Sequence, residues 1–296
     1  MKRKENQRAD MNITGRTRLL ALFGSPVKHS GSPAMYNYSF ERLGLDYVYV
    51  AIDVGREGLK EAVSAARLYN MRGFNLTMPC KNDVMSYIDE LSPEARLIGA
   101  VNTVVNENGR LIGYNTDGTG FVKNLEAHNI TVKNKKIVVT GAGGAATSIV
   151  VQLALDGARE ICIFNKKSES FKRMLETIER IKKEVPDTVI NIYDILDETK
   201  YTETIKQADI FVNATVAGMK PLENESVIKD ISAFHKNLVV ADVVYNPIET
   251  RLLKEAGNAG CICIDGKGML LWQGVYAFKL YTGKDMPVEE VRSKFF

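Results

Sequence analysis

The architecture of this chain is predicted by one segment, Lys136-Ile-Val-Val-Thr-Gly141-Ala-Gly-Gly-Ala-Ala146-Thr-Ser148. Its first half is an apolar, β-branched run, and a turn rich in glycine follows directly. Apolar residues then recur at helical spacing from Ile149 to Leu155, and Gly157 is a candidate C-cap. The segment therefore predicts a strand, a glycine turn and a helix, in that order.

Three small residues of this turn, Gly141, Gly143 and Ala146, fit the pattern G-x-G-x-x-G/A. In that pattern the first residue permits a tight turn, the second lets the backbone approach a pyrophosphate, and the third lets helix and strand pack closely. The helix that follows offers free N–H groups and the positive end of its dipole to phosphate groups. A purely structural turn is the alternative, but the strand before it and the helix after it favour a dinucleotide site.

Downstream of the turn, apolar runs of strand length alternate with helical patterns such as the one from Ser168 to Glu184. Alternation of this kind predicts a parallel, doubly wound sheet. Further strands are expected at 159–164, 189–193, 210–215, 238–244 and 261–265. This half of the chain is therefore predicted to be a Rossmann dinucleotide-binding domain of the α/β class.

The first part of the chain also has an α/β pattern, with strands and a helix expected at 18–23, 47–52 and 58–70. Ser32 is expected to be the N-cap of a helix whose first position is Pro33. The unit 73–81 is expected to be a strand that runs into a helix, with Lys81 in the first helical turn. A cation is electrostatically misplaced at a helix N-terminus, which indicates a partner anion for Lys81.

The pair Asn108-Gly109 lies between two apolar runs and predicts a β-hairpin over 99–114. The polar cluster Asn115-Thr116-Asp117-Gly118 then opens a helix, and taken alone it is most simply an N-cap. An apolar helix from Gly266 follows the last strand and is expected to return to the first domain. That domain would then be discontinuous, with a cleft between the two halves of the chain.

The composition of the chain argues against some classes of binding partner. The chain has 296 residues, 45% of them apolar, and Lys+Arg 39 against Asp+Glu 36 leaves a net charge of +3. This balance does not favour nucleic acid or an anionic membrane as a partner. No stretch approaches the ~20 consecutive apolar residues that a membrane span needs. The N-terminus lacks the apolar region of a signal peptide, so a flexible tail over residues 1–16 and a cytoplasmic location are expected.

No metal site is predicted from the four cysteines. They are scattered, and Cys261 and Cys263 alternate with isoleucines as expected for two residues on one face of a buried strand. A metal site would need further ligands nearby, and the three histidines, His29, His128 and His235, do not supply them.

The choice of cofactor depends on the residues at the end of the second strand of a dinucleotide domain. An acid there would bind the ribose 2′-OH of NAD, and a base would accept the 2′-phosphate of NADP. Asn165-Lys166-Lys167-Ser168 occupies this position, and the first acid after it is Glu169. NADP is therefore favoured, and NAD use stays open because Ser168 or Glu169 could reach the ribose.

Six motifs follow one another in the order found in the shikimate dehydrogenases, which the sequence resembles over nearly all of its length after the tail. The motifs are Ser30-Gly-Ser-Pro33, Asn75-Leu-Thr-Met-Pro-Cys-Lys81, Gly99-Ala-Val-Asn-Thr103, Asn115-Thr-Asp-Gly118, Gly141-Ala-Gly-Gly-Ala145 and Gly268-Met-Leu-Leu-Trp-Gln273. Two further segments, 217–226 and 245–247, look more like the quinate/shikimate dehydrogenase branch. That branch typically has an acid where Ser168 stands, so this departure argues against the branch's preference for NAD.

The resemblance implies a substrate-binding and catalytic domain at 17–116 and 270–296, and a Rossmann domain at 117–269. It implies reversible NAD(P)-dependent reduction of 3-dehydroshikimate to shikimate, a step of aromatic amino-acid biosynthesis. A quinate/shikimate dehydrogenase with a broader substrate range and NAD use is the alternative within this class. A nucleotide-binding regulatory module without turnover is the alternative from another class. A homodimer is left open.

By resemblance, Lys81 and Asp117 form the catalytic pair. A carbonyl that gains a hydride develops negative charge and must be protonated, and a lysine held by a carboxylate can stabilise that oxygen and relay the proton. A regulatory module would be expected to lack one of these two residues, and both are present.

The resemblance also implies the residues that bind the substrate and the cofactor. Ser30 and Ser32, helped by Tyr245, are implied to bind the substrate carboxylate. The residues implied to hydrogen-bond its ring hydroxyls are Thr77, Asn102 and Gln273. Cofactor contacts are implied for Gly141, Ala142, Gly143, Gly144, Ala145, Asn165, Lys166, Lys167, Ser168, Lys220, Asp242, Val243, Tyr245 and Gly268.

Overall fold

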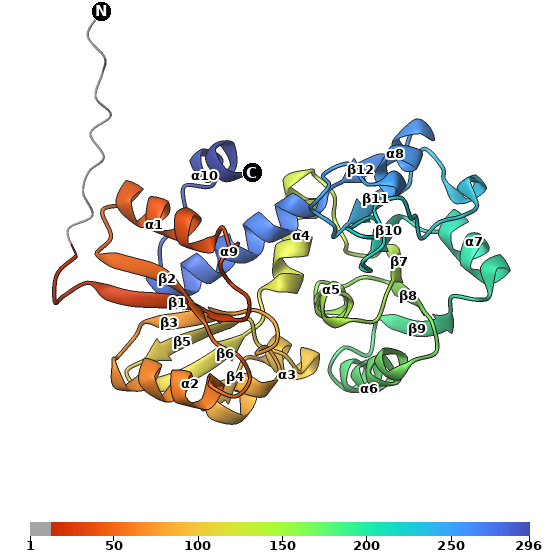
Figure 1. The fold of residues 1–296 in the computed structure, drawn as a ribbon. Helices are drawn as coiled ribbons and strands as arrows, with labels where there is room; N and C mark the ends of the chain where they lie inside the picture. The colour runs from red at the N-terminus through yellow and green to blue at the C-terminus, as the bar shows by residue number, and fades with distance from the viewer. Residues whose placement is uncertain (1–12) are drawn as a thin grey trace, which may run out of the picture. The chain divides into compact units, whose positions relative to one another are not determined.

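The structure is a computed structural model that describes residues 13–296, so residues 1–12 of the predicted tail lie outside it. The chain forms two compact units (Figure 1). The first unit contains residues 13–90 together with Val101–Tyr114 and Phe278–Phe296. The second contains Leu91–Ala100 and Asn115–Ala277.

The second unit is built on a parallel sheet of six strands in the order β12-β11-β10-β7-β8-β9. Counted along the chain within this unit, the order is 3-2-1-4-5-6, which is that of the dinucleotide-binding Rossmann fold. The predicted fold class is confirmed. The strands are β7 (Lys136–Thr140), β8 (Glu160–Asn165), β9 (Val189–Asp194), β10 (Ile210–Asn213), β11 (Val239–Asp242) and β12 (Ile262–Ile264).

Helices cover both faces of this sheet, and each face has its own hydrophobic core (Figure 1). Because side chains alternate along a strand, Ile137 and Val139 enter one core and Val138 enters the other. The first core takes residues from α4 (Asp117–Ala127), α5 (Gly144–Leu155) and α6 (Glu169–Glu184). The second takes residues from α7 (Glu198–Lys206) and α8 (Arg251–Asn258).

The first unit has a mixed sheet in the order β2-β1-β3-β5-β6-β4. β1 is parallel to β2 and β3, whereas β5 is antiparallel to β3 and β6. The predicted hairpin is confirmed as β5 and β6, and its turn residues Asn108 and Gly109 both have positive φ. The strands are β1 (Arg18–Gly24), β2 (Tyr47–Asp53), β3 (Gly73–Leu76), β4 (Glu90–Leu91), β5 (Thr103–Glu107) and β6 (Arg110–Tyr114).

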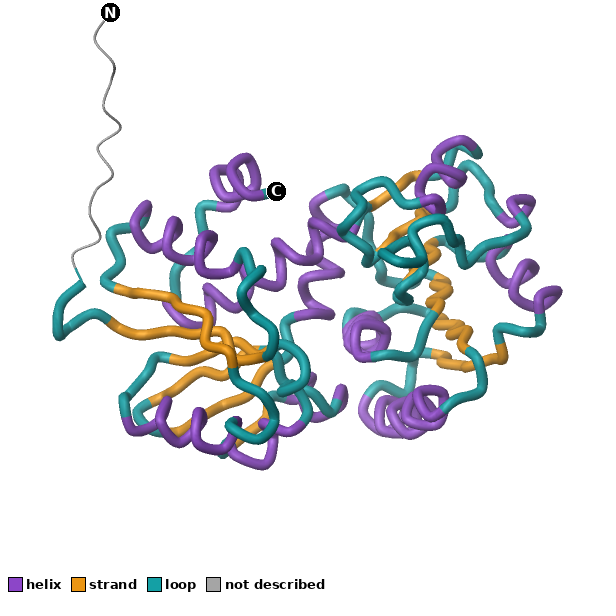
Figure 2. Tube along the Cα trace, viewed as in Figure 1, coloured by secondary structure: helices purple, strands orange, loops and turns teal. Residues whose placement is uncertain are grey.

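In the first unit, α1 (Ser32–Arg42) and the end of α9 (Gly266–Thr282) cover one face of the sheet, and α2 (Leu59–Leu68) covers the other (Figure 1). Figure 2 shows the strands of each unit as one layer between helices. Aromatic rings fill the first of these interfaces: Tyr36 stacks on Tyr49 at 4.5 Å, and Phe40 stacks on Phe278 at 5.4 Å. The last helix is α10 (Val288–Phe295).

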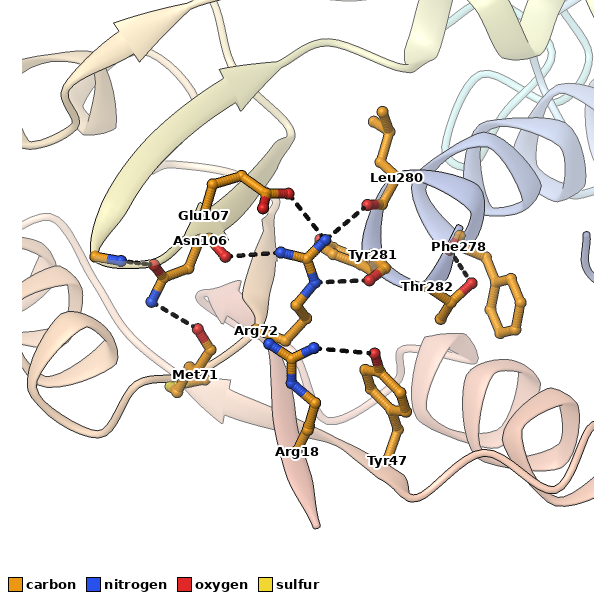
Figure 3. A network of polar contacts seen from close by, with 11 residues as sticks. Arg18, Tyr47, Met71, Arg72, Asn106, Glu107, Phe278, Leu280, Tyr281 and Thr282 are labelled. Carbon is orange, nitrogen blue, oxygen red and sulfur yellow. Dashed lines mark hydrogen bonds and ion pairs between the residues drawn. The ribbon is translucent and has the colours of Figure 1, made fainter. Parts of the chain in front are cut away.

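Arg72, which precedes β3, ties the end of α9 to the sheet of the first unit (Figure 3). Its Nε donates to the Tyr281 carbonyl at 2.7 Å, and its Nη1 donates to the Asn106 carbonyl at 2.7 Å. Its Nη2 pairs with the Glu107 carboxylate at 3.0 Å. Hydrogen bonds to charged groups are stronger than neutral ones, so this guanidinium fixes the last turn of α9 on β5.

Two local predictions on the first unit are wrong. Gly31 is the N-cap of α1, and Ser32 is already helical, so the helix begins one residue earlier than predicted. No helix includes Lys81: residues 78–82 form turns, and a single 3₁₀ turn, η1 (Asp83–Tyr87), follows. The Lys81 carbonyl accepts a hydrogen bond from the Val101 amide at 2.8 Å, so its partner lies in a neighbouring segment of the chain and not in a helix.

Cys261 and Cys263 are not in a buried strand. Cys263 lies in β12, the edge strand of its sheet, and is exposed, whereas Cys261 precedes β12 and is partly exposed. The alternation of Cys and Ile is the same for an edge strand as for a central one, because both have a side-chain period of two. Among residues 13–296, none of the helices has both the length and the apolar character that a membrane span requires.

The short helix α3 (Pro93–Ile98) belongs by its contacts to the second unit, whereas the sequence placed it in the first domain. Leu97 and Ile98 are buried in the core that α5 and α6 form. The helix ends at Gly99, whose φ of 73° suits a left-handed C-cap.

Candidate functional site

Two loops meet at the carboxyl end of the first sheet. The Ser25 amide donates to the Met78 carbonyl at 3.0 Å, and the Thr77 amide donates to the Phe23 carbonyl at 2.9 Å. A Cβ added to Gly24 would overlap the Thr77 Cγ2 and lie 3.0 Å from the Met78 oxygen, so glycine permits this close approach. The segment after β1 and the segment after β3 are therefore held side by side.

Ser30 and Ser32 lie where the first of these loops enters α1. The Ser30 amide donates to the Val27 carbonyl at 3.0 Å, and the Ser32 amide donates to the Ser30 hydroxyl at 3.2 Å. This turn places both hydroxyls at the N-terminus of an 11-residue helix, where the dipole favours a negative charge.

Asn102 and Thr77 lie at the same edge of the sheet. β5 is antiparallel to β3, so the residue before β5 adjoins the end of β3: the Leu76 amide donates to the Asn102 carbonyl at 2.8 Å. Asn102 is only 2% exposed, and its Oδ1 accepts from the Thr103 hydroxyl at 2.9 Å. The predicted residues of the first unit thus lie on the segments that follow β1 and β3 and precede β5, and the Val101 amide holds the Lys81 carbonyl: they are Ser30, Ser32, Thr77, Lys81 and Asn102.

The glycine turn lies between β7 and α5, and Gly141 has a φ of +114°. A Cβ on Gly141 would lie 2.8 Å from the Ala214 oxygen of the neighbouring strand end, so the position requires glycine. Gly143 and Gly144 have open space where a Cβ would be, and Ala146 is fully buried between helix and sheet. The geometry matches the role that the pattern assigns to each position.

The segment Asn165–Ser168 ends β8 and leads into α6. The Asn165 side-chain amide donates to the Lys166 carbonyl at 2.8 Å and to the Ser170 hydroxyl at 3.2 Å, which folds the segment on itself. Lys166, Lys167 and Ser168 are exposed. Glu169 lies 4.0 Å from Lys172, so the nearest acid has a cation as its neighbour.

The remaining predicted cofactor residues of this unit follow β10 and β11. Asp242 ends β11, and its buried carboxylate accepts hydrogen bonds from protein groups, among them the Thr250 hydroxyl at 2.7 Å. Val243 comes next, and Tyr245 is exposed two residues later. Lys220 is exposed in the loop after β10. These loops lie at the carboxyl edge of the sheet, the edge that also carries the glycine turn.

Asp117 opens α4, and the next residue fixes that helix against α5. A Cβ on Gly118 would overlap the Ser148 carbonyl oxygen and lie 2.7 Å from the Gln152 Cβ. The Thr119 hydroxyl donates to the Gln152 Oε1 at 3.0 Å on the same interface. Since α5 begins at the glycine turn, this contact sets the position of Asp117 relative to the turn.

A second close contact joins α4 to α9. A Cβ on Gly120 would lie 2.6 Å from the Gln273 backbone nitrogen, and one on Gly268 would overlap the Asn124 side chain. Gln273 is therefore held against α4 within the second unit. Sequence reasoning did not identify Gly118 and Gly120 as packing residues, although glycine is a poor helix former and a glycine inside a helix often marks a close approach of another backbone.

Each unit thus carries a distinct chemical set. The first has a lysine with neutral hydroxyl and amide groups, which suits a polyhydroxylated acid. The second has a phosphate-binding turn at the point where strand order reverses, a carboxylate on α4 and a cationic segment after the second strand. In the described part of the chain, no group of three or more His, Cys, Asp or Glu side chains is placed to hold a metal ion.

Comparison with family models divides the chain in a similar way. Residues 22–104 match a model described as the shikimate dehydrogenase substrate binding domain. Residues 124–259 match the model of shikimate / quinate 5-dehydrogenase. Residues 266–294 match that of the shikimate 5'-dehydrogenase C-terminal domain.

Individual relatives are similar over nearly their whole length. A shikimate dehydrogenase (NADP(+)) of Listeria monocytogenes is 45% identical over 96% of this chain and 97% of its own length. A quinate/shikimate dehydrogenase of Escherichia coli is 44% identical over 95% of this chain and 98% of its own. The crystal structure of a Listeria monocytogenes shikimate 5-dehydrogenase in complex with shikimate and NAD superposes with a TM-score of 0.93 at 45% identity, covering 96% of this chain and 98% of that one.

Proposed function

The chain belongs to the shikimate dehydrogenase family, and from this we propose that it catalyses the reversible NAD(P)-dependent reduction of 3-dehydroshikimate to shikimate. The observation that carries the proposal is the packing of α4 on α5. The backbone of Gly118 packs closely on Ser148, and this supports a defined position for Asp117 relative to the phosphate-binding turn that begins α5. An oxidoreductase needs this relation between a proton-handling group and its dinucleotide, whereas a binding module does not.

The chemistry assigned to Lys81 and Asp117 follows from the charge that develops on the substrate. When bound, the dinucleotide supplies or accepts the hydride. In the reducing direction the Lys81 ammonium stabilises the carbonyl oxygen as it becomes negative and donates a proton to it. In the oxidising direction Lys81 takes the hydroxyl proton. The Asp117 carboxylate orients the lysine, as a charged hydrogen bond does in other acid–base pairs.

Neutral groups orient the acid in this proposal. The hydroxyls of Ser30, Ser32 and Tyr245 bind its carboxylate, and the ring hydroxyls are bound by Thr77, Asn102 and Gln273. A site built from buried hydrogen-bonding groups rejects an analogue that lacks the matching hydroxyl, because the protein groups are then unpaired. Substrate choice is therefore expected to depend on these six residues.

The first test concerns the carboxylate-binding hydroxyls. The double variant Ser30→Ala, Ser32→Ala is expected to raise the KM for shikimate by about a hundredfold or more, because each lost hydrogen bond to a charged group is worth ~1.5–3 kcal/mol and every ~1.4 kcal/mol corresponds to a factor of ten. The KM for NADP should stay unchanged. Ser64→Ala removes an exposed hydroxyl of α2 that donates to the Lys60 carbonyl, and it serves as the control. An unchanged KM for shikimate in the double variant would refute this assignment.

NADP is the favoured cofactor and NAD remains usable. Relatives of this chain include an enzyme named for NADP(+) and a structure that contains NAD. The exposed Lys166 and Lys167 provide positive charge at the end of β8, where a 2′-phosphate would lie. Glu169, the nearest acid, has Lys172 beside it.

Ser168→Asp is expected to shift the ratio of kcat/KM for NADP over NAD towards NAD by about tenfold, since ~1.4 kcal/mol of repulsion corresponds to that factor. Steady-state rates with each cofactor at saturating shikimate measure the ratio. Thr131→Asp adds the same charge before β7, at the opposite edge of the sheet, and should leave the ratio unchanged. If both variants shift it equally, the effect is one of net charge and the assignment of the 2′-site is wrong.

A quinate/shikimate dehydrogenase is the second candidate, because a relative of that name is 44% identical to this chain. Rates for shikimate and quinate, each with NAD and with NADP, separate the two. Oxidation of neither acid with either cofactor would overturn both and favour the regulatory module. The homodimer and the cytoplasmic location stay predictions from the sequence.

A further inference from the structure

Three buried polar side chains lie at the end of β10, at the end of β11 and at the start of α8, and the proposed mechanism assigns no step to them, although Asp242 is among the predicted cofactor residues. Asn213, Asp242 and Thr250 are exposed by only 1%, 2% and 1%. Burying a carboxylate is costly unless it accepts hydrogen bonds, so a buried acid indicates a structure built around it. Burial raises the pKa of Asp242, and the hydrogen bonds from Val244, Thr250 and Asn213 lower it.

The Asp242 carboxylate joins two loops. Its Oδ1 accepts from the Asn213 side-chain amide at 3.0 Å and from the Val244 amide at 3.0 Å. Its Oδ2 accepts from the Thr250 hydroxyl at 2.7 Å. Thr250 is also the N-cap of α8, where its hydroxyl accepts from the Leu253 amide at 3.3 Å. The hydroxyl therefore fixes the carboxylate to the start of a helix.

The loop after β10 is folded around Asn213. The Asn213 Oδ1 accepts from the Thr215 amide at 3.1 Å and from the Thr215 hydroxyl at 2.7 Å. Its Nδ2 donates to the Ala217 carbonyl at 3.1 Å as well as to Asp242. Since Asn213 shares Asp242 with Thr250, the shape of this loop depends on the Thr250 hydroxyl.

This loop also contacts the glycine turn. The Ala214 amide donates to the Thr140 carbonyl at 2.8 Å, and the Ala214 oxygen is the atom that a Cβ on Gly141 would approach. Gly218, with a φ of +96°, lies so close to Thr250 that its Cβ would be 3.0 Å from the Thr250 Cγ2. The network therefore spans from the start of α8 to the phosphate-binding turn.

The loops so held present exposed apolar side chains at the edge of the sheet. Val216 is 57% exposed, Met219 39% and Tyr245 47%. β10 adjoins β7 at the point where strand order reverses, and ligands of open α/β sheets bind at that point. Binding pockets are lined mainly by apolar groups with a few fixed polar ones, so these side chains suit the flat face of a ring.

We infer that Thr250, acting through Asp242, is a positioning residue that holds the loops after β10 and β11 in the arrangement required by the nicotinamide half of the dinucleotide. The inference rests on the proposed function, because it takes that dinucleotide to be the ligand. Thr250 itself does not contact the ligand. Groups that support a binding site in this way set its geometry, and an error of ~1 Å can cost ~10²-fold in rate.

Thr250→Val keeps the shape of the side chain and removes the donor to Asp242. The dissociation constant of NADP⁺ alone, measured by titration calorimetry on the full chain, is expected to rise about tenfold, and the KM for NADP⁺ in step with it. Thr250→Ser restores the hydroxyl and should bind NADP⁺ within about twofold of the unmodified protein. Thr188→Val is the matched control, since Thr188 is buried in the same unit and its hydroxyl donates to the Ala158 carbonyl at 2.8 Å before β9.

Gly218→Ala perturbs the same loop and leaves the hydrogen bonds of the Asp242 carboxylate in place. If Thr250→Val does not fold, this variant tests whether NADP⁺ binding depends on the conformation of the loop. It is expected to weaken NADP⁺ binding as well, because its Cβ would press the loop away from Thr250. Unchanged NADP⁺ binding in the folded variants, or an equal loss in Thr188→Val, would overturn the inference. If the unmodified protein binds NADP⁺ but oxidises neither acid, the proposed function fails while the binding comparison still tests Thr250.

Discussion

Replacing Lys81 with alanine is expected to lower kcat for shikimate oxidation by about 10²–10⁴-fold, the contribution usual for one general acid–base group. The KM for shikimate should change much less, because Lys81 acts on the oxygen whose charge changes in the transition state. The measurement is steady-state oxidation of shikimate at saturating NADP⁺. Val101 donates to the Lys81 carbonyl and not to its side chain, so the loop can keep its conformation in the variant.

Lys81→Arg separates the two roles proposed for this residue. A guanidinium stays positive and can stabilise the oxygen, but it does not release its proton in a protein. It should therefore leave kcat low, near that of Lys81→Ala. Lys60→Ala removes an exposed cation of α2 in the same unit and serves as the control. If Lys81→Ala raised KM but left kcat intact, Lys81 would be a binding residue and the catalytic assignment would be wrong.

Gly118→Ala is expected to destabilise the second unit by about 3 kcal/mol, at the upper end of the usual cost of overpacking. The added Cβ would overlap the Ser148 carbonyl oxygen, and backbone of a helix cannot move aside as a flexible side chain can. Urea unfolding measures the loss. At low temperature, where the variant is still folded, kcat should fall as well, because α4 must shift and Asp117 moves with it.

Gly257→Ala is the matched control for this variant. Gly257 lies inside α8, and the nearest atom to its added Cβ is the Cys263 Sγ at 3.8 Å, an ordinary contact. Alanine is a better helix former than glycine by ~1 kcal/mol, so this variant should be as stable as the unmodified protein or more so. Equal stability of Gly118→Ala and the unmodified protein would show that α4 is not locked on α5.

The sequence correctly predicted those parts of the fold in which a local pattern is compatible with a single structure. The β-branched run before Gly141 and the alternation after it led to the parallel sheet, and Asn108-Gly109 led to the hairpin. α7 was not predicted, because only Tyr201 and Ile205 of its residues are buried and its apolar period is weak. The helix expected to contain Lys81 is absent because a tertiary contact with Val101 takes the carbonyl that a helix would use.

The residues of the candidate site also fall into two groups, those that could be predicted from the sequence and those that could not. The residues proposed to face a ligand were named from motifs, whereas the residues that pack against them were not. The role of Gly118 depends on its close contact with Ser148, which the sequence does not show. In the same way, Thr250 can be predicted as an N-cap, but its second hydrogen bond, to Asp242, cannot. Such roles depend on contacts between residues distant in sequence, which no local pattern records.

The Arg72 contacts have a consequence for the order in which the protein matures during synthesis. Tyr36 and Phe40 both contact Phe278, Tyr36 also contacts Tyr281, and Arg72 binds the carbonyls of Leu280 and Tyr281. A nascent chain released as far as Ala277 contains every residue of the second unit and lacks the end of the first. Because domains fold as units while the ribosome extends the chain, the unit encoded later is the first that can be completed. Until the end of α9 has been synthesised, the aromatic side chains of the first unit that it covers stay exposed, and chaperones can bind them.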